Sequence, residues 1–204
     1  MRTIGVVRSS SDEASAWAAA LRDDSDGYAA VFDQNLDRVY RHALRLARNP
    51  HDAEDLTASA FLELWRRRKH VRVVDGSVLP WLLVTVTNLE HNHARGQRRY
   101  RSLLAALPRG EDSRAAADIA MEHMAADSAA ESVRQALGKL GPSDAALIAL
   151  TAFEHFAPGQ AAAALGISPG AARTRLHRAR ARMASELGAS AEQGPGAVSM
   201  EEMR

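Results

Sequence analysis

The stretch NPHDAEDLTASAFLELWRRR, residues 49–68, decides the fold because it carries the start, the buried face and the end of one helix. Asn49 is a favoured N-cap, and Pro50 fits the first turn, where its missing N–H group has no partner to lose. Carboxylates follow where the helix dipole favours negative charge, and three arginines end the segment where it favours positive charge. Apolar residues recur between them at three- and four-residue steps. This spacing predicts an amphipathic helix.

Composition narrows the class of protein. The chain has 204 residues, of which 46% are hydrophobic but only 5% aromatic, and this balance predicts small helical cores rich in Ala and Leu. No cysteine is present, which excludes disulfides and Cys-based zinc sites, and no apolar run is long enough to span a membrane. The N-terminus lacks the order of a signal peptide. We therefore expect a cytoplasmic protein with no membrane insertion, cofactor or metal. Its net charge is only +1, but Lys and Arg are strongly clustered along the sequence.

Periodic segments separated by breaks predict an all-α fold of two small helical domains joined by a flexible linker, the second with a helix-turn-helix. The first domain pairs the helix over 49–68 with a long amphipathic helix from Tyr28. A loop with an Asp75-Gly76 turn signal leads to a further helix from Pro80. The expected boundaries are an N-terminal extension over 1–22, the first domain over 23–101, the linker over 102–128, the second domain over 129–189 and a disordered tail over 190–204.

The helix from Pro80 to Tyr100 carries a polar stripe suited to single-stranded DNA. An aromatic plane can stack a base, amides can hydrogen-bond base edges, and guanidinium groups can meet phosphates. The alternative for the aromatic residue is a place in the protein core. By the 3.6-residue period, the stripe comprises Trp81, Asn88, Asn92, Arg95 and Arg99.

A helix-turn-helix is expected in the second domain. Pro158 opens a short Ala-rich helix, Gly166 turns the chain, and Ser168-Pro169 starts a last helix that reaches about Leu187. Small and apolar residues form the core side of this helix, and basic residues occupy nearly every other position with no acidic residue among them. This clustering predicts DNA contact by Arg173, Thr174, Arg175, His177, Arg178 and Arg180, with Arg180 or Arg182 acting mainly on the DNA backbone.

The segment DAEDLTASAFLELWRR resembles region two of the extracytoplasmic-function (ECF) sigma factors, the small promoter-specificity subunits of bacterial RNA polymerase. In that family this helix docks on the clamp helices of the largest polymerase subunit. The resemblance implies three partners: core RNA polymerase, promoter DNA and an anti-sigma factor. The implied contacts on the polymerase are the clamp helices and the flap of its two large subunits. The implied polymerase-binding residues are Asp52, Glu54, Asp55, Phe61 and Trp65.

Two further segments resemble the same family. PWLLVTVTN, residues 80–88, is similar to the segment that reads and melts the promoter −10 element, with the preceding loop holding a flipped base, although Thr87 stands where an arginine is common. LGISPGAARTRLHRARARM, residues 165–183, is similar to region four, whose recognition helix enters the −35 major groove. The helix before it departs from the family, because PGQAAAAL replaces a more acidic and bulkier sequence. The resemblance implies a promoter-recognition subunit that is not an enzyme.

Two other classes of function remain open at the level of sequence. A repressor or activator would use only the helix-turn-helix, with the N-terminal helices for dimerisation or effector binding, and would leave residues 49–99 unexplained. A nuclease built on His91 and His93, or a hydrolase using the carboxylates of residues 52–55, needs a metal shell or nucleophile that no spacing supports. The acidic cluster by itself is also accounted for by helix stability. Promoter recognition is the leading interpretation.

Overall fold

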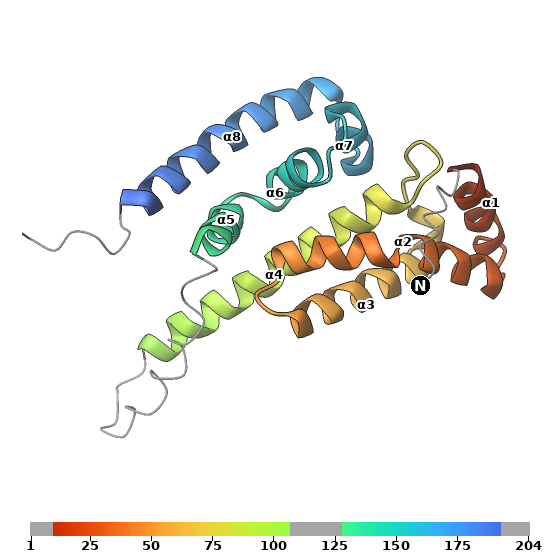
Figure 1. Cartoon of the computed structure of the whole chain (residues 1–204), viewed down its shortest axis with the longest axis horizontal. Coiled ribbons are helices and arrows are strands. Elements are labelled where there is room, and N and C mark those ends of the chain that lie inside the picture. Colours follow the sequence, from red (N-terminus) through yellow and green to blue (C-terminus); the bar gives the residue numbers. More distant parts are fainter. Residues whose placement is uncertain (1–9, 107–127, 193–204) are drawn as a thin grey trace, which may run out of the picture.

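The computed structural model describes residues 10–106 and 128–192, and Figure 1 shows them as helices in two adjoining layers. Within these ranges no β-strand is present, and extended backbone pairs only in an isolated bridge between Val74 and Ser77. The predicted all-α fold is thus confirmed. The elements are α1 (Ser10–Ala20), α2 (Ser25–Leu46), α3 (Pro50–Arg66), the 3₁₀-helix η1 (Arg68–His70), α4 (Leu79–Ala106), α5 (Ser128–Lys139), α6 (Pro142–Ile148), the π-helix η3 (Ala149–Phe153), α7 (Pro158–Leu165) and α8 (Pro169–Glu192).

Helices α1 to α4 share one hydrophobic core, which we call the N-terminal domain. Leu64 of α3 and Leu82 and Leu83 of α4 are fully buried, and Trp17 of α1 is 4% exposed. Full burial of a leucine side chain stabilises a fold by about 1.5–3 kcal/mol. Gly27 lets α2 approach α1 closely, because a side-chain carbon there would clash with the backbone of α1. The first helix therefore belongs to the packing of this domain.

The start of α3 agrees with the prediction from sequence. Asn49 Oδ1 accepts a hydrogen bond of 2.8 Å from the Asp52 backbone N–H, and Pro50 is the first helical residue. Near the other end of α3, the Tyr28 hydroxyl of α2 donates to the Phe61 carbonyl at 2.6 Å. Burial raises the pKa of Tyr28 to about 12, so the hydroxyl keeps its proton as a donor at neutral pH. This bond joins α2 to α3.

Residues 71–78 form a tight hairpin between η1 and α4. Asp75 and Gly76 both have positive φ, 52° and 78°, as a type I′ turn requires. The Asp-Gly signal in the sequence therefore marks the turn of the hairpin. The hairpin is anchored to α1, because Glu13 Oε1 accepts hydrogen bonds from the Ser77 hydroxyl at 3.0 Å and from the next backbone N–H at 2.8 Å.

Helices α5 to α8 form the C-terminal domain, whose buried residues join those of the N-terminal domain in one continuous cluster. Leu147 and Leu150 are buried at its centre, and alanines provide much of the buried surface of α7 and α8. Gly166 ends α7 with a φ of 65°, in the left-handed region that glycine adopts without a steric cost, and Pro169 starts α8. The predicted helix-turn-helix is present at these positions.

The backbone winding widens between α6 and α7. At the end of η3 the Glu154 N–H donates to the carbonyl of Ala149, five residues earlier, at 3.2 Å, which is the hydrogen-bond pattern of a π-helix. The Glu154 side chain turns toward α2 and is almost entirely buried.

The two domains lie side by side, with α6 and α7 packed along α4 (Figure 1). Hydrogen bonds cross the junction at both ends: His91 Nε2 lies 2.9 Å from the Leu140 carbonyl oxygen, and Gln160 Nε2 donates to Asp75 Oδ2 at 2.6 Å. Sequence spacing did not predict this contact between the domains.

Helices continue into segments for which the sequence predicted other structure. α4 extends to Ala106, past the expected start of the linker, and α8 extends to Glu192, past the expected start of the tail. The rest of the expected linker, the rest of the tail and the first nine residues of the expected N-terminal extension lie outside the described residues.

Candidate nucleic-acid interface

The solvent-facing side of α8 is a row of basic and polar side chains. Ala172, Leu176 and Ala179 hold the opposite side against the C-terminal domain and are at most 3% exposed. Their spacing of four and three residues places all three on one face of the helix, which leaves the other face to solvent. The exposed members of the predicted DNA-contacting set are Arg173, Thr174, His177, Arg178 and Arg180.

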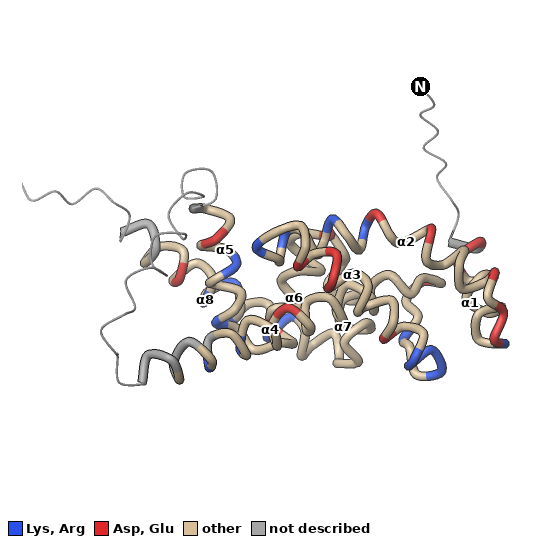
Figure 2. Tube along the Cα trace, turned by 90° about the horizontal axis from the view of Figure 1, so that it is seen from below, with Lys and Arg blue, Asp and Glu red and all other residues tan. Residues whose placement is uncertain are grey.

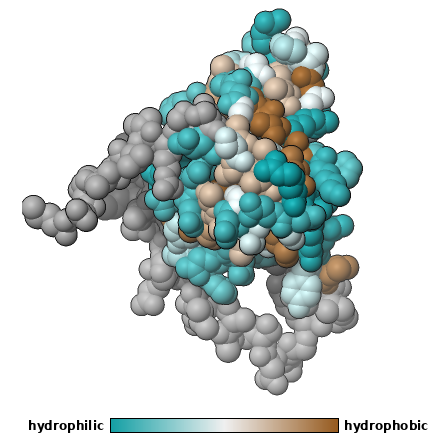
Figure 3. Space-filling model, turned by 90° about the vertical axis from the view of Figure 1, so that its right-hand side faces the viewer, coloured by the Kyte–Doolittle hydropathy of each residue, from teal (hydrophilic) through white to brown (hydrophobic). Residues whose placement is uncertain are grey.

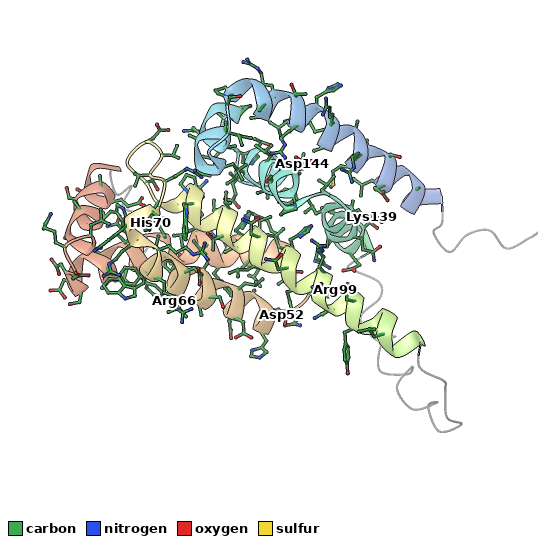
Figure 4. The ribbon with its side chains drawn as sticks, turned by 180° about the vertical axis from the view of Figure 1, so that it is seen from behind. Asp52, Arg66, His70, Arg99, Lys139 and Asp144 are labelled. Atoms are coloured by element: carbon green, nitrogen blue, oxygen red, sulfur yellow. The ribbon has the colours of Figure 1, made fainter. Side chains whose placement is uncertain are left out.

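Two arginines of α8 are engaged within the C-terminal domain. Arg175 Nε lies 3.3 Å from Asp144 Oδ1 of α6, a residue labelled in Figure 4. Arg182 Nη2 donates to the Lys139 carbonyl of α5 at 2.9 Å. These contacts fix α8 against α5 and α6. A DNA contact by Arg175 would therefore require its ion pair to open, unlike a contact by the fully exposed residues.

The predicted stripe on α4 has a partly buried start and an exposed end. Trp81 is half-buried and packs against the hydrophobic core. This position lies between the two that the sequence left open, stacking on a base and burial in the core. Asn88 is also half-buried, whereas Asn92, Arg95 and Arg99 are exposed. Figure 4 labels Arg99 on the part of α4 that extends beyond α2 and α3. Asn92, Arg95 and Arg99 are thus available to a nucleic acid.

The hairpin over residues 71–78 adds an apolar side chain beside the start of α4. Val73 is 43% exposed, and Leu21 at the end of α1 is 38% exposed. Figure 3 shows this end of the molecule, where apolar side chains lie among hydrophilic ones. Sequence reasoning placed a base-holding loop here without naming a residue. The run of β-branched residues in VRVV was the signal that could have identified Val73.

The acidic residues at the start of α3 differ in exposure. Glu54 and Asp55 are exposed, and Asp55 Oδ2 lies 4.0 Å from His51 Nε2. Asp52 is half-buried, and its carboxylate accepts a hydrogen bond of 2.9 Å from the Asn49 amide. Asp52 therefore takes part in the helix start, and Glu54 and Asp55 are the carboxylates free to meet a protein partner.

The aromatic residues of α3 lie toward the core. Phe61 is 4% exposed and packs against Phe32 with ring centroids 4.5 Å apart. Phe61 therefore belongs to the core, and a direct contact of its ring with the polymerase stays a prediction. Trp65 is half-buried, with the ring of Tyr28 at 5.0 Å on edge and the Arg68 guanidinium 4.1 Å from its ring centroid. These contacts leave part of Trp65 accessible.

Leu62 is an exposed apolar residue of α3 that sequence reasoning did not single out. It is 48% exposed and follows Asp55 by seven residues, which places both on the same helix face. An apolar residue in phase with two carboxylates was the available signal. Figure 2 colours the four basic residues 66–69 that follow this face at the end of α3. The outer surface of α3 thus runs from acidic through apolar to basic.

A cavity of about 500 Å³ lies between the domains, lined by residues of α3, α4 and α5 that include Asp52, Glu90, His91 and Glu131. Burial raises the pKa of the Glu90 carboxyl, an effect that the nearby Asp52 carboxylate adds to and that His93 and Arg48 partly offset. In the described part of the chain, no group of three or more His, Cys, Asp or Glu side chains could hold a metal ion.

The two histidines of α4 do not converge on one site. His91 is 8% exposed and faces the C-terminal domain, whereas His93 is exposed and lies 3.2 Å from the Gln97 amide nitrogen. The geometry therefore offers no support for a nuclease. Among the described helices, none is both long and apolar enough to cross a membrane.

Comparison with known proteins agrees with this arrangement. The family model of Sigma-70 region 2 matches residues 31–100, and the model of Sigma-70, region 4 matches residues 130–183. The ECF RNA polymerase sigma factor SigE of Mycolicibacterium smegmatis is 36% identical over 155 residues, which are 76% of this chain but only 59% of SigE. The RNA polymerase sigma factor CarQ of Myxococcus xanthus is 30% identical over 164 residues, 80% of this chain and 90% of CarQ.

A solved structure shares the fold. The structure of CnrH in complex with the cytosolic domain of CnrY matches with a TM-score of 0.55 and 21% sequence identity, and the match covers 87% of this chain and 98% of that chain. Sigma factors are transcription-initiation factors and not enzymes. With both sigma-70 regions present in order, and with CarQ matched over most of its length, the chain belongs to the ECF sigma factors of bacterial RNA polymerase.

Proposed function

We propose that this chain binds core RNA polymerase and directs it to promoters, reading the −10 element with α4 and its hairpin and the −35 element with α8. The observation that carries the proposal is that one chain holds both sigma-70 regions and presents an exposed polar or basic face on each. Its place of action is the cytoplasm, where RNA polymerase works.

The exposed face of α8 suits the major groove of duplex DNA. An α-helix fits this groove, and an arginine can donate two hydrogen bonds to one guanine. Arg173 and His177 lie near the start of α8, one turn apart, and are the candidates for base contact. Arg178 contacts a base or a phosphate, and Arg180 contacts the DNA backbone. Burial of the opposite face supports this side of α8 as the one that meets the groove.

The stripe on α4 suits DNA whose strands are parting. Asn92 offers an amide to a base edge, and Arg95 and Arg99 offer charge to phosphates. Duplex DNA hides its base faces, so Trp81 and the apolar Val73 gain base contacts only when a base leaves the stack, at a cost of about a few kcal/mol. These groups therefore favour the open promoter complex.

The outer surface of α3 is the proposed contact with core polymerase. Glu54, Asp55 and Leu62 are exposed on one face, and Trp65 is partly accessible beside it. CnrH was solved with the cytosolic domain of CnrY, and an anti-sigma factor that holds this chain inactive stays a prediction.

Run-off transcription tests the proposal. Core polymerase alone and core polymerase with the purified chain are compared on a promoter library, and the transcripts are sequenced. We expect new start sites that share one −10 and one −35 sequence. Binding to duplex DNA without new transcription would instead indicate a repressor or activator that uses only the helix-turn-helix.

Replacement of the stripe amides is expected to slow promoter opening. Asn88→Ala and Asn92→Ala each remove one neutral hydrogen bond to a base, worth about 1 kcal/mol, so opening should slow roughly fivefold. Polymerase assembly and duplex −35 binding should stay unchanged. Permanganate reactivity of unpaired thymines measures the opening rate, and a template already unpaired across −10 should recover part of the loss.

Gln97→Ala is the matched control, because Gln97 is an exposed amide of α4 on the opposite side from the stripe. Equal slowing by all three substitutions would show that the stripe has no special role in opening.

A further inference from the structure

One carboxylate of the first helix is bonded to the hairpin that precedes α4. Glu13 Oε1 accepts a hydrogen bond from the Ser77 hydroxyl at 3.0 Å and another from the Val78 backbone N–H at 2.8 Å. The Asn35 amide of α2 donates to the same oxygen at 3.4 Å. Glu13 therefore joins three elements, α1, α2 and the hairpin, which lie side by side at this end of the N-terminal domain (Figure 1).

These bonds provide acceptors for the backbone donors at the start of α4. The Ser77 hydroxyl donates to Glu13 and accepts a hydrogen bond of 3.1 Å from the Leu79 N–H, so both the last amide before α4 and the first within it are paired. Val78 and Leu79 are at most 8% exposed, and a buried N–H without an acceptor is costly. A carboxylate is also favoured beside the N-terminus of a helix. Glu13 thus acts as a cap for α4 that comes from a different helix.

Buried neighbours hold Glu13 in place. Asn35 is 3% exposed, and its amide also donates to the Val31 carbonyl at 2.8 Å, which fixes the amide that meets Glu13. Trp17 follows Glu13 by four residues on the same face of α1 and is 4% exposed. The carboxylate is therefore positioned by the packing of α1 on α2.

The orientation of the hairpin depends on contacts outside it. Val74 and Ser77 exchange two backbone hydrogen bonds of 3.0 Å, but a two-stranded hairpin by itself is marginally stable. Burial of Val74 attaches the hairpin without fixing its direction, since hydrophobic contact is non-directional, whereas hydrogen bonds have preferred angles. Gln160 bonds the turn from the C-terminal domain, and Glu13 bonds the second strand from the N-terminal domain. The bonds to Glu13 therefore link the direction of Val73 to α1.

We propose that Glu13 is a positioning residue for −10 recognition: it orients the hairpin so that Val73 meets a base that has left the stack. The proposal rests on the proposed function, because it concerns how the hairpin is held and takes from that function what the hairpin reads. Helix α1, for which the sequence indicated no role, becomes part of the −10 reading apparatus. Loss of Glu13 should alter which base is accepted although every residue that meets the DNA is still present.

Single-stranded −10 oligonucleotides bound to the holoenzyme test this role. Core polymerase is assembled with the full chain or a variant, and fluorescent oligonucleotides carry each of the bases in turn at every −10 position. The position read by the hairpin is the one at which Val73→Ala loses base discrimination. Glu13→Ala should reduce discrimination at that same position about tenfold, the effect of losing one hydrogen bond to a charged group, and leave the other positions unchanged.

A series of substitutions separates the hydrogen-bond acceptor from the charge. Glu13→Gln keeps an oxygen at the same reach and should retain most of the discrimination, whereas Glu13→Asp is shorter by one methylene and should behave like Glu13→Ala. Asp12→Ala is the matched control, because Asp12 is an exposed carboxylate of the same helix and its loss makes the same change in net charge. This control should discriminate as the parent chain does.

A role in stability alone is distinguished by a core substitution in the same helix. Trp17→Phe should lower the unfolding temperature of the chain, measured by circular dichroism, while leaving the acceptor for the hairpin in place. It should therefore keep the base discrimination. Hydrogen exchange on the free chain adds a readout without DNA, since Glu13→Ala should speed exchange of the Val78 and Leu79 amides and Glu13→Gln should not.

The outcomes separate this proposal from the function on which it rests. Full discrimination in the Glu13→Ala holoenzyme would overturn the positioning role, as would an equal loss in Trp17→Phe. A parent holoenzyme with no base preference at any −10 position would count against the proposed function and would remove the positioning role with it. Discrimination in the parent that is lost in Glu13→Ala and restored in Glu13→Gln is the result that supports both.

Discussion

The double reversal Glu54→Lys and Asp55→Lys is expected to abolish assembly with core RNA polymerase. Both side chains are exposed at the start of α3, and like charges placed opposite each other in an interface cost about several kcal/mol, or at least a hundredfold in affinity. Asp52 is left unchanged because its carboxylate bonds to the helix cap. Size-exclusion chromatography with labelled chain and core polymerase measures the loss, and circular dichroism checks that the helices remain.

The reversal has a matched control on the neighbouring helix. Asp33 and Asp37 are exposed carboxylates of α2, and Asp33→Lys with Asp37→Lys makes the same change in net charge. This control should assemble normally. If both pairs of substitutions abolished assembly, net charge and not the α3 surface would be responsible. Normal assembly of the Glu54 and Asp55 variant would place the polymerase contact elsewhere.

Loss of base-contacting arginines from α8 is the second large effect that we expect. Arg173→Ala should weaken binding to the preferred −35 duplex by about 1–3 kcal/mol and relax the preference at one base pair, because a bidentate contact to guanine carries that much discrimination. Arg182→Ala should weaken binding to all −35 duplexes by one similar and smaller factor, because we expect Arg182 to act mainly on the DNA backbone.

A panel of −35 duplexes with single base changes, titrated at two salt concentrations, distinguishes these outcomes. Binding of the full chain should fall steeply as salt rises, because an arginine-rich helix releases counterions from phosphates. Arg175→Ala should have a smaller effect than Arg173→Ala, since Arg175 is paired with Asp144. Equal losses for Arg173→Ala and Arg182→Ala on every duplex would remove the division between base and backbone contacts.

Local signals in the sequence predicted the elements well. Asn49 and Pro50 placed the start of α3, the Asp-Gly pair placed the hairpin turn, and Gly166 placed the turn of the helix-turn-helix. Each of these depends on backbone conformations that few residue types adopt, so the residue type identifies the structure. Such signals need no knowledge of the rest of the chain.

Periodicity alone could not assign every side chain to the core or the surface. Phe61 and Leu62 are adjacent apolar residues of α3, yet the first is 4% exposed and the second 48%. An aromatic residue attracted the functional interpretation, although its position beside Phe32 makes it part of the core. The outcome depends on which neighbouring helix covers each face, and that is decided by tertiary packing.

Docking of the domains was beyond sequence reasoning for a different reason. Glu154 and His42 are 112 residues apart, and neither stands in a motif that indicates the other. Thr87 was noted as a departure from the family, but its bond with His42 appears only when α2 and α4 are placed together. Single-sequence patterns carry local information, and a contact between two domains is not local.

The wide turn of η3 lets the chain hold one residue more than an α-helix of the same span while Glu154 still faces α2. Each residue advances an α-helix by about 100°, and a π-turn accommodates one extra residue. Because the π-turn absorbs the extra residue, deleting one residue from Ala149–Phe153 should return this segment to α-helical winding and leave Glu154 facing Arg38 and Arg45 of α2. The chain can therefore lose one residue at this point without losing the ion pairs that Glu154 makes with α2.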